Sequence, residues 1–273
     1  MKLTEMKQIL ASGQIQLTKS LGQNFLHDQN QLRRIVDAAA LTKTDRVLEV
    51  GPGLGPLTEM LVAQAGEVLA VEKDRRLVDF LLQHFAATAN LKLLHDDALD
   101  FLRREPHDWT DWKLVANLPY SVASPILVDL AQAAGRPQRM VATLQLEVAS
   151  RLVAQTDDDD YGILSLLMQL RYEPAGHFKI PADCFFPAPD VDSACVTLVR
   201  REQPLLPADQ HALFERVVKV SFSQRRKMML KLLKQVWPIE KLQTGFDQLG
   251  LSPQIRAEKV SLQQFVELTR ILA

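Results

Sequence analysis

The stretch Glu49-Val50-Gly51-Pro52-Gly53-Leu54-Gly55 carries the apolar run 46–50 into a glycine-rich turn. Glycines two residues apart allow a tight turn and bring the backbone close to a ligand at a helix amino terminus, so Gly51 and Gly53 are predicted cofactor contacts. A nicotinamide-binding fingerprint needs its third glycine where Pro56 stands, and no P-loop Gly-Lys-Ser/Thr follows. A tight turn without any ligand is the alternative interpretation.

Further strand-like runs follow this turn at regular intervals. Buried strands are predicted at residues 67–72, 91–95, 113–117 and 139–146, with helical spacing between them, as at 57–65 and 75–85. This alternation is typical of βαβ units, which place the carboxyl ends of parallel strands on one ligand-binding edge. Two later apolar runs, 163–172 and 194–200, are predicted to add strands to the sheet, the last of them antiparallel.

The pattern changes after residue 203. Before it lie a polar loop at 156–162 and a proline-rich segment at 180–192, which we expect to lack regular structure. After it, helices are predicted at 211–222, 224–235, 239–249 and 262–272, the last capped by Ser261. We therefore predict an α/β domain over residues 1–203 and a helical domain over residues 204–273.

Composition narrows the class of protein. The 273 residues are 47% hydrophobic and 24% charged, as in soluble globular proteins. No apolar run is long enough to cross a bilayer, and residues 1–10 do not resemble a signal peptide. We therefore expect no membrane contact. Cys184 and Cys195 fit neither a disulfide framework nor a zinc motif, so we also expect a cytoplasmic protein with no metal site.

The net charge of −1 conceals an asymmetry. Residues 201–273 contain 12 basic and 7 acidic side chains, whereas residues 1–200 contain 20 and 26. Such a basic excess indicates an anionic partner for the carboxyl-terminal part. A solvated helix face is the alternative interpretation.

Acidic side chains follow the second and third predicted strands. Glu72 is placed to accept the hydroxyls of a ribose, and Asp97 to accept a hydrogen bond from an adenine amino group. Asp74 is expected to cap the next helix, and capping is the alternative for Asp97 too. With the glycine turn, these positions indicate S-adenosylmethionine, which contains an adenosine and no pyrophosphate.

The fourth strand ends in Asn117-Leu118-Pro119-Tyr120. An adenine amino group is a poor nucleophile, so an enzyme that methylates it needs acceptors that orient its hydrogens. The Asn117 side-chain oxygen and the Leu118 carbonyl are predicted to do this, while Tyr120 offers a stacking face. Phe185 or Phe186 is predicted to cover the other face of the base, with core packing as the alternative.

With these motifs the sequence closely resembles the small-subunit rRNA adenine N6,N6-dimethyltransferases (KsgA-type enzymes). The resemblance covers almost the whole chain and includes residues 19–26, 49–55, 71–74, 96–99, 117–125, 145–152, 160–165, 185–193 and 222–228. It implies a Rossmann-like class I methyltransferase fold, with a mostly parallel seven-stranded sheet and a small all-α carboxyl-terminal domain. Leu146 stands where the family usually has Lys, and residues 1–18 form a longer extension than in some members.

The resemblance also implies roles for single residues. Cofactor contacts fall on Asn24, Leu26, Gly51, Glu72, Asp97 and Asn117. Target-base residues fall on Asn117, Leu118, Tyr120 and Phe185. The segment 222–228 favours the small-subunit enzymes over the related macrolide-resistance methyltransferases and mitochondrial transcription factors. It also implies rRNA phosphate contacts from Arg225, Arg226, Lys227, Lys231 and Lys234.

The sequence thus predicts an enzyme that dimethylates two adjacent adenosines near the 3′ end of 16S rRNA, with S-adenosylmethionine as the methyl donor. Its expected partner is the immature small ribosomal subunit, and a monomer is expected. Two alternatives stay open: a non-catalytic checkpoint protein in ribosome assembly, and a methyltransferase of large-subunit rRNA adenine.

Overall fold

The structure is a computed structural model that describes residues 1, 3–12, 15, 23–104, 107–224 and 226–273. The chain forms two compact units. One contains Met1–Ala149 and Pro174–Arg200, and the other contains Ser150–Glu173 and Arg201–Ala273. This division differs from the predicted boundary at residue 203, because residues 154–170 contribute apolar side chains to the core of the helical unit.

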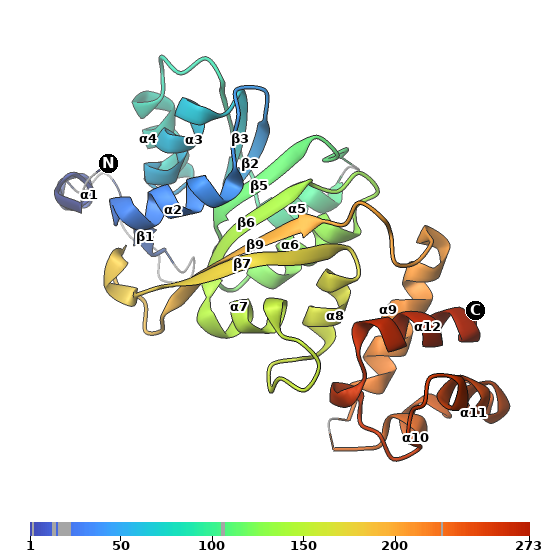
Figure 1. The fold of residues 1–273 in the computed structure, drawn as a ribbon. Coiled ribbons are helices and arrows are strands. Elements are labelled where there is room, and N and C mark those ends of the chain that lie inside the picture. Colours follow the sequence, from blue (N-terminus) through green and yellow to red (C-terminus); the bar gives the residue numbers. More distant parts are fainter. Residues whose placement is uncertain (2, 13–14, 16–22, 105–106, 225) are drawn as a thin grey trace. The chain divides into compact units, whose positions relative to one another are not determined.

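A seven-stranded sheet forms the centre of the first unit among the described residues. Its order is β4-β3-β2-β5-β6-β9-β7, and Figure 1 labels the part of it from β3 to β7. The strands are β2 (Arg46–Val50), β3 (Glu67–Glu72), β4 (Leu91–His95), β5 (Trp112–Asn117), β6 (Arg139–Gln145), β7 (Tyr172–Ile180) and β9 (Ser193–Arg200). Strands β2 to β6 pair in parallel and β9 runs antiparallel to β6, which confirms the predicted parallel sheet and its antiparallel addition.

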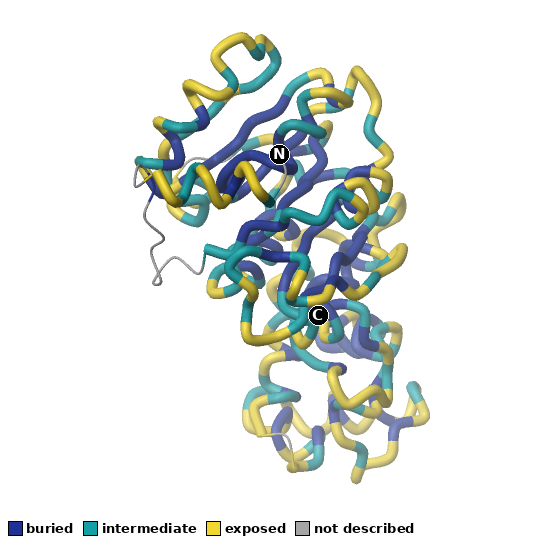
Figure 2. The backbone as a smooth tube through the Cα atoms, turned by 90° about the vertical axis from the view of Figure 1, so that its left-hand side faces the viewer, coloured by how far each residue is buried: buried dark blue, intermediate teal, exposed yellow. Residues whose placement is uncertain are grey.

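Helices cover the sheet and bury its apolar strands. Helices α2 (Gln29–Ala39) and α3 (Pro56–Gln64) share a core with β2, β3, β5 and β6, while α4 (Arg75–His84) packs on β3 and β4. Helices α5 (Ala98–Arg104) and α6 (Ala123–Gln132) pack against each other. Figure 2 shows long buried stretches of this unit in dark blue. Leu146 begins α7 (Leu146–Val153), where the sequence predicted the end of a strand.

Two segments far apart in the sequence pair beside the sheet. Strand β1 (Phe25–Leu26) runs antiparallel to β8 (Phe185–Phe186), with Leu26 opposite Phe185. The proline-rich segment therefore contains a short strand and a 3-10 helix (Ala182–Cys184), where no regular structure was predicted. Within the extension at residues 1–18, helix α1 (Leu3–Ala11) buries Met6 against Phe25 and Leu54.

The strand predicted at residues 163–172 is wrong. Residues Ile163–Gln169 form helix α8, and the strand β7 begins only at Tyr172. Because Ser165–Gln169 are buried on all sides, their apolar run has no helical period and cannot be told from a buried strand. Strand β7 lies at the sheet edge, contains Pro174 and is largely exposed, so it lacks the apolar pattern of an inner strand.

The helical unit contains α8, α9 (His211–Ser221), α10 (Met229–Leu233), α11 (Ile239–Gln248) and α12 (Leu262–Leu272). Their core includes the buried rings of Phe214, Phe246 and Phe265. Ser261 caps α12 as predicted: its side chain accepts from the Gln264 N–H at 3.2 Å, and the Gln264 side chain accepts from the Ser261 N–H at 3.0 Å. No helix among the described residues is long and apolar enough to span a membrane.

The helix predicted at 224–235 is also wrong over most of its length, because α10 covers only five residues. Lys227 donates its backbone N–H to the Gln224 carbonyl in a turn. Met229 donates its own to the carbonyl of Ile255, so a tertiary contact takes the place of a preceding helical turn. Pro238 stands soon after α10, consistent with the end of a helix before a proline.

Candidate active site

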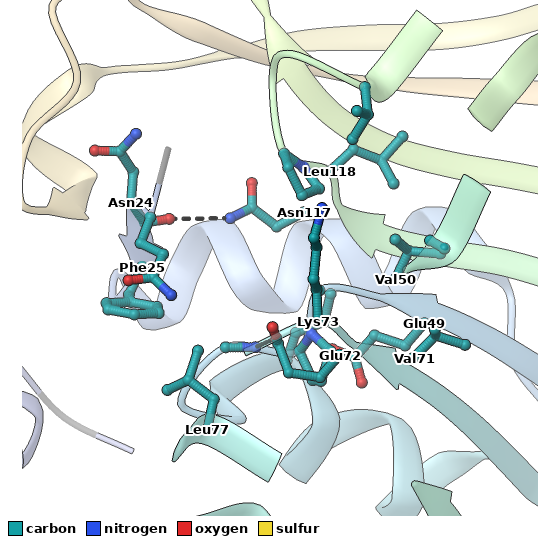
Figure 3. A pocket seen from close by; sticks show the side chains of 18 of the residues that line it. Asn24, Phe25, Glu49, Val50, Val71, Glu72, Lys73, Leu77, Asn117 and Leu118 are labelled. Carbon is teal, nitrogen blue, oxygen red and sulfur yellow. Dashed lines mark hydrogen bonds between the residues drawn. The ribbon is translucent and has the colours of Figure 1, made fainter. Parts of the chain in front are cut away.

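A cavity of about 180 Å³ lies at the carboxyl edge of β2, β3 and β5 (Figure 3). It is lined by nine of the ten residues predicted to bind the cofactor or the target base: Asn24, Leu26, Gly51, Gly53, Glu72, Asp97, Asn117, Leu118 and Tyr120. They come from β1, the glycine turn and the ends of three strands, and all belong to the first compact unit. The parallel sheet therefore gathers side chains that are widely separated in the sequence.

The glycine turn requires glycine for two separate reasons. Gly51 and Gly53 adopt φ values of 69° and 61°, in the left-handed region that other residues rarely occupy. A Cβ atom on Gly53 would also lie 2.8 Å from the ring of Phe25, which is too close for contact. Phe25, which is part of the cavity wall, therefore packs directly against the backbone of this turn.

Glu72 presents a buried carboxylate to the cavity. One of its oxygens accepts the N–H of Asp74 at 2.9 Å, and the other accepts the N–H of Gly53 at 3.2 Å. Burial raises the pKa of Glu72 above its usual range, although these N–H groups oppose the shift. A carboxylate has about four acceptor positions, so Glu72 retains capacity for further donors such as a pair of hydroxyls.

Asp97 is held by protein groups on both oxygens. One accepts from Lys73 at 2.8 Å, and the other accepts the backbone N–H of Leu99 at 2.8 Å. The hydrogen bond from Lys73 holds the pKa of Asp97 below its ordinary value. Asp97 therefore caps the helix that follows, which was the alternative interpretation, while its contact to an adenine stays a prediction. Asp74 caps α4 as predicted, because it accepts the N–H of Arg76 at 3.1 Å.

The Asn117 amide is oriented by a residue from another part of the chain. Its Nδ2 donates to the backbone carbonyl of Asn24 at 3.3 Å, as the dashed line in Figure 3 shows. Its Oδ1 is buried and has no hydrogen-bond partner among the described residues. A buried acceptor left without a donor is costly, so this oxygen is suited to receive a donor from a bound molecule.

Phe185 does not line the cavity. Its side chain is 3% exposed and packs in the core that includes Leu26, Ile180 and Cys195. The core interpretation thus describes the place of Phe185, and its role over the target base stays a prediction. Phe186 is half-buried, and the Lys7 ammonium lies 5.3 Å from the centre of its ring.

Several lining residues were missed by the sequence analysis. Gln23, Phe25, Lys73 and Leu77 all contribute to the cavity wall. Gln23, Phe25 and Lys73 had a usable signal, since they stand within the motif segments 19–26 and 71–74, whereas Leu77 lies in no motif. Glu49 also lines the cavity, and burial raises its pKa to about 8, with the charge of Glu72 adding to the shift.

The predicted RNA-binding residues lie in the helical unit. Lys227, Lys231 and Lys234 are exposed and surround a hollow of about 330 Å³. Arg226 is also exposed, whereas Arg225 lies outside the described residues, as do Lys19 to Gly22 of the amino-terminal motif. No group of three or more His, Cys, Asp or Glu side chains is arranged to hold a metal ion in the described part of the chain.

Comparison with known proteins decides the family. Residues 14–273 match the model of the family described as Ribosomal RNA adenine dimethylase. The chain belongs to the ribosomal RNA adenine dimethylase family. Curated relatives named Ribosomal RNA small subunit methyltransferase A include those of Geobacillus thermodenitrificans and Geobacter metallireducens. The first is 37% identical over 97% of this chain and 94% of the relative, and the second is 38% identical over 94% and 96%.

Solved structures agree with this family assignment at the level of the fold. The 23S rRNA methyltransferase ErmE superposes with a TM-score of 0.73 at 28% identity, covering 91% of this chain and 99% of that one. A dimethyladenosine transferase from Plasmodium falciparum gives 0.77 at 23% identity, covering 89% and 95%. The Rossmann-like methyltransferase fold expected from the sequence is therefore confirmed for this family member, which is an rRNA adenine dimethyltransferase.

Proposed function

We propose that the protein transfers methyl groups from S-adenosylmethionine to the N6 amino groups of two adjacent adenosines near the 3′ end of 16S rRNA. The family assignment and the names of the relatives support this activity and a small-subunit substrate. The proposed substrate is the immature small ribosomal subunit, where the target bases are still unmethylated.

The residues around the cavity fit the proposed cofactor. Gly51 and Gly53 present bare backbone to the cavity wall, beside which the amino-acid part of the cofactor would lie, and Glu72 is suited to accept the ribose hydroxyls. Asp97 retains acceptor positions for the adenine amino group. When bound, S-adenosylmethionine supplies an electrophilic methyl group. The proposal rests on one observation: Glu72, Asp97 and the Asn117 oxygen, which lacks a hydrogen-bond partner among the described residues, line the same cavity.

The residues at the end of β5 are suited to activate an amino group. The lone pair of adenine N6 is delocalised into the ring, so the nitrogen attacks well only when it becomes pyramidal. Asn117 Oδ1 and the Leu118 carbonyl would accept its two hydrogens and hold it in that geometry. Tyr120 would stack on the extruded base. Orientation and electrostatics then supply the rate enhancement, and no general base is needed before transfer.

The exposed lysines of the helical unit are suited to bind the RNA backbone. Lys227, Lys231 and Lys234 project around one hollow, where phosphates would replace their counterions. Such contacts position the RNA without reading its sequence. We infer that specificity comes from the shape of the RNA and from the unstacked target bases.

The decisive experiment uses labelled S-adenosylmethionine and small subunits that lack the dimethyladenosines, followed by nucleoside analysis of the 16S rRNA. We expect N6,N6-dimethyladenosine in the wild-type reaction and far less with a Glu72→Ala variant at a cofactor concentration near the wild-type dissociation constant. Large subunits serve as a parallel substrate. Label only in 23S rRNA, or no label at all, would contradict the proposal. If Glu72→Ala restores subunit assembly in a strain without the enzyme while the 16S rRNA stays unmethylated, a binding role dominates instead.

A further inference from the structure

The hydroxyl of Tyr120 makes a hydrogen bond that has no role in the chemistry proposed above. The phenolic oxygen lies 2.6 Å from the Oγ of Ser193, a hydrogen bond in which either group can be the donor. Tyr120 lines the cavity, while the serine is fully buried. Burial also raises the pKa of Tyr120, so its hydroxyl keeps its proton at neutral pH.

The sheet topology brings Ser193 to this position. Ser193 is the first residue of β9 and pairs with Gln145, the last residue of β6. Strand β6 is parallel to β5, and Thr143 of β6 stands opposite Asn117. Because β9 is antiparallel, its amino end reaches the edge at which the parallel strands have their carboxyl ends. A serine far along the chain therefore lies beside the turn that carries Tyr120.

The backbone before Ser193 is fixed on both sides. The carbonyl of Asp192 accepts the N–H of Leu146 at 3.0 Å, and its carboxylate accepts the N–H of Ala182 at 3.1 Å. The same carboxylate pairs with Lys179 at 2.6 Å. Ser193 is thus a rigid support, whereas Tyr120 stands in the turn after β5, and its hydrogen bond to Ser193 fixes the far end of its ring.

We propose that Ser193 is a positioning residue for the methyl transfer, because its hydroxyl holds the Tyr120 ring in the plane on which the target adenine stacks. This inference rests on the proposed function and adds a residue to its machinery. Ser193 does not touch the base, and it acts only through Tyr120. A ring held in place before the base arrives reduces the ordering that base binding requires.

The test is a double-mutant cycle with Ser193→Ala and Tyr120→Phe, in which both changes remove the hydrogen bond and keep the ring. Single-turnover methyl transfer to undermethylated small subunits is measured, with the dissociation constant for S-adenosylhomocysteine and the melting temperature. One net hydrogen bond corresponds to about fivefold in rate. We expect each single variant to be slower by about that factor and the double variant to be no slower than either.

The matched control is Thr197→Val, which removes another buried hydroxyl from β9 away from the cavity. It should transfer at the wild-type rate, and all variants should bind S-adenosylhomocysteine like the wild type. A Ser193→Ala variant as fast as wild type contradicts the inference, and so do effects that multiply in the double variant. If the wild type itself transfers no methyl group, the proposed function fails, and the role of Ser193 with it.

Discussion

The cavity at the sheet edge and the lysine hollow of the helical unit are built on different principles. At the edge, polar groups are buried and bound to particular partners, as Glu72 is to two backbone N–H groups and Asn117 to Asn24. In the hollow, Lys227, Lys231 and Lys234 are exposed side chains on a turn and a five-residue helix. The edge fixes geometry, whereas the hollow supplies charge.

This difference sets how each region should respond to change. A buried group with fixed partners cannot be replaced by a neighbour, so its loss is expected to be severe and insensitive to salt. Exposed charges around a hollow all contribute to phosphate binding, so the removal of any one of them should weaken RNA binding by a modest, salt-dependent amount. The following experiments test this contrast.

Asn117→Ala should have the largest effect. It removes the unpartnered acceptor, and by analogy with the loss of one hydrogen-bonding group that stabilises a transition state, transfer should slow by about 10²–10³-fold. Affinity for S-adenosylhomocysteine should be retained in part. Asn90→Ala is the control, since Asn90 also donates to backbone carbonyls but lies outside the cavity. A wild-type rate of transfer in the Asn117 variant would remove the role of the amide.

Glu49→Gln should change the pH dependence of stability. The folded protein holds the Glu49 pKa near 8, compared with 4.5 ordinarily, so the carboxyl takes up a proton more readily in the folded state. This contribution to stability is complete below pH 4.5 and is lost as pH rises to about 8. The free energy of unfolding of wild type minus variant should therefore fall over that range, by several kcal/mol. A constant difference would show that Glu49 titrates normally.

Glu72→Ala should weaken cofactor binding. Hydrogen bonds to a charged group contribute about 1.5–3 kcal/mol, which corresponds to roughly 10–100-fold in the dissociation constant for S-adenosylhomocysteine. Isothermal titration measures it. Glu67→Ala, on the same strand but in an exposed pair with Arg46, is the matched control and should bind normally. Equal affinities for the two variants would place the ribose elsewhere.

Replacing Lys231 and Lys234 by Gln should reduce affinity for small-subunit RNA by about tenfold at moderate salt, without changing affinity for S-adenosylhomocysteine. The slope of log affinity against log salt should decrease by about 0.7–0.9 for each phosphate that the variant no longer neutralises. Lys241→Gln removes an exposed charge elsewhere in the helical unit and serves as the control. An unchanged salt slope would exclude phosphate binding at the hollow.

Ser261→Ala should give the smallest effect. It removes the cap of α12 and is expected to lower the free energy of unfolding by about 1 kcal/mol. Affinity for S-adenosylhomocysteine should not change, because Ser261 belongs to the helical unit and does not line the cavity. Chemical denaturation measures the first quantity and calorimetric titration the second. A loss of cofactor affinity would contradict the separation of roles between the two regions.

The sequence predicted strands β2, β3 and β4 with the bounds that the structure shows, because apolar runs bounded by turns specify strands. The predicted burial is correct for β2 and β3 but wrong for β4, which lies at the edge of the sheet and has only half-buried and exposed residues. It failed at α8, where an apolar run is buried all round, and at α10, where Met229 bonds to Ile255. In both cases the deciding partner lies far away in the sequence.

Charge shows the same limit. The residues after 200 are strongly basic, but the helical unit also contains Ser150–Glu173, with two basic and five acidic side chains. The whole unit thus holds 14 basic and 12 acidic residues. Asp157 pairs with Lys259 at 2.7 Å, so part of this acidity is neutralised locally. The basic character belongs to the segment around the hollow rather than to the unit.

The amino-acid sequence alone determined the glycine turn, the capped helices and the strands whose ends carry Glu72 and Asn117, because these depend on local backbone preferences and on periodicity. Only the tertiary structure decided which group orients each functional side chain. Asn24 and Asn117, which form a hydrogen bond, are 93 residues apart in the sequence, and Ser193 and Tyr120, which form another, are 73 residues apart. Contacts at such separations depend on strand order and register, which no local pattern specifies.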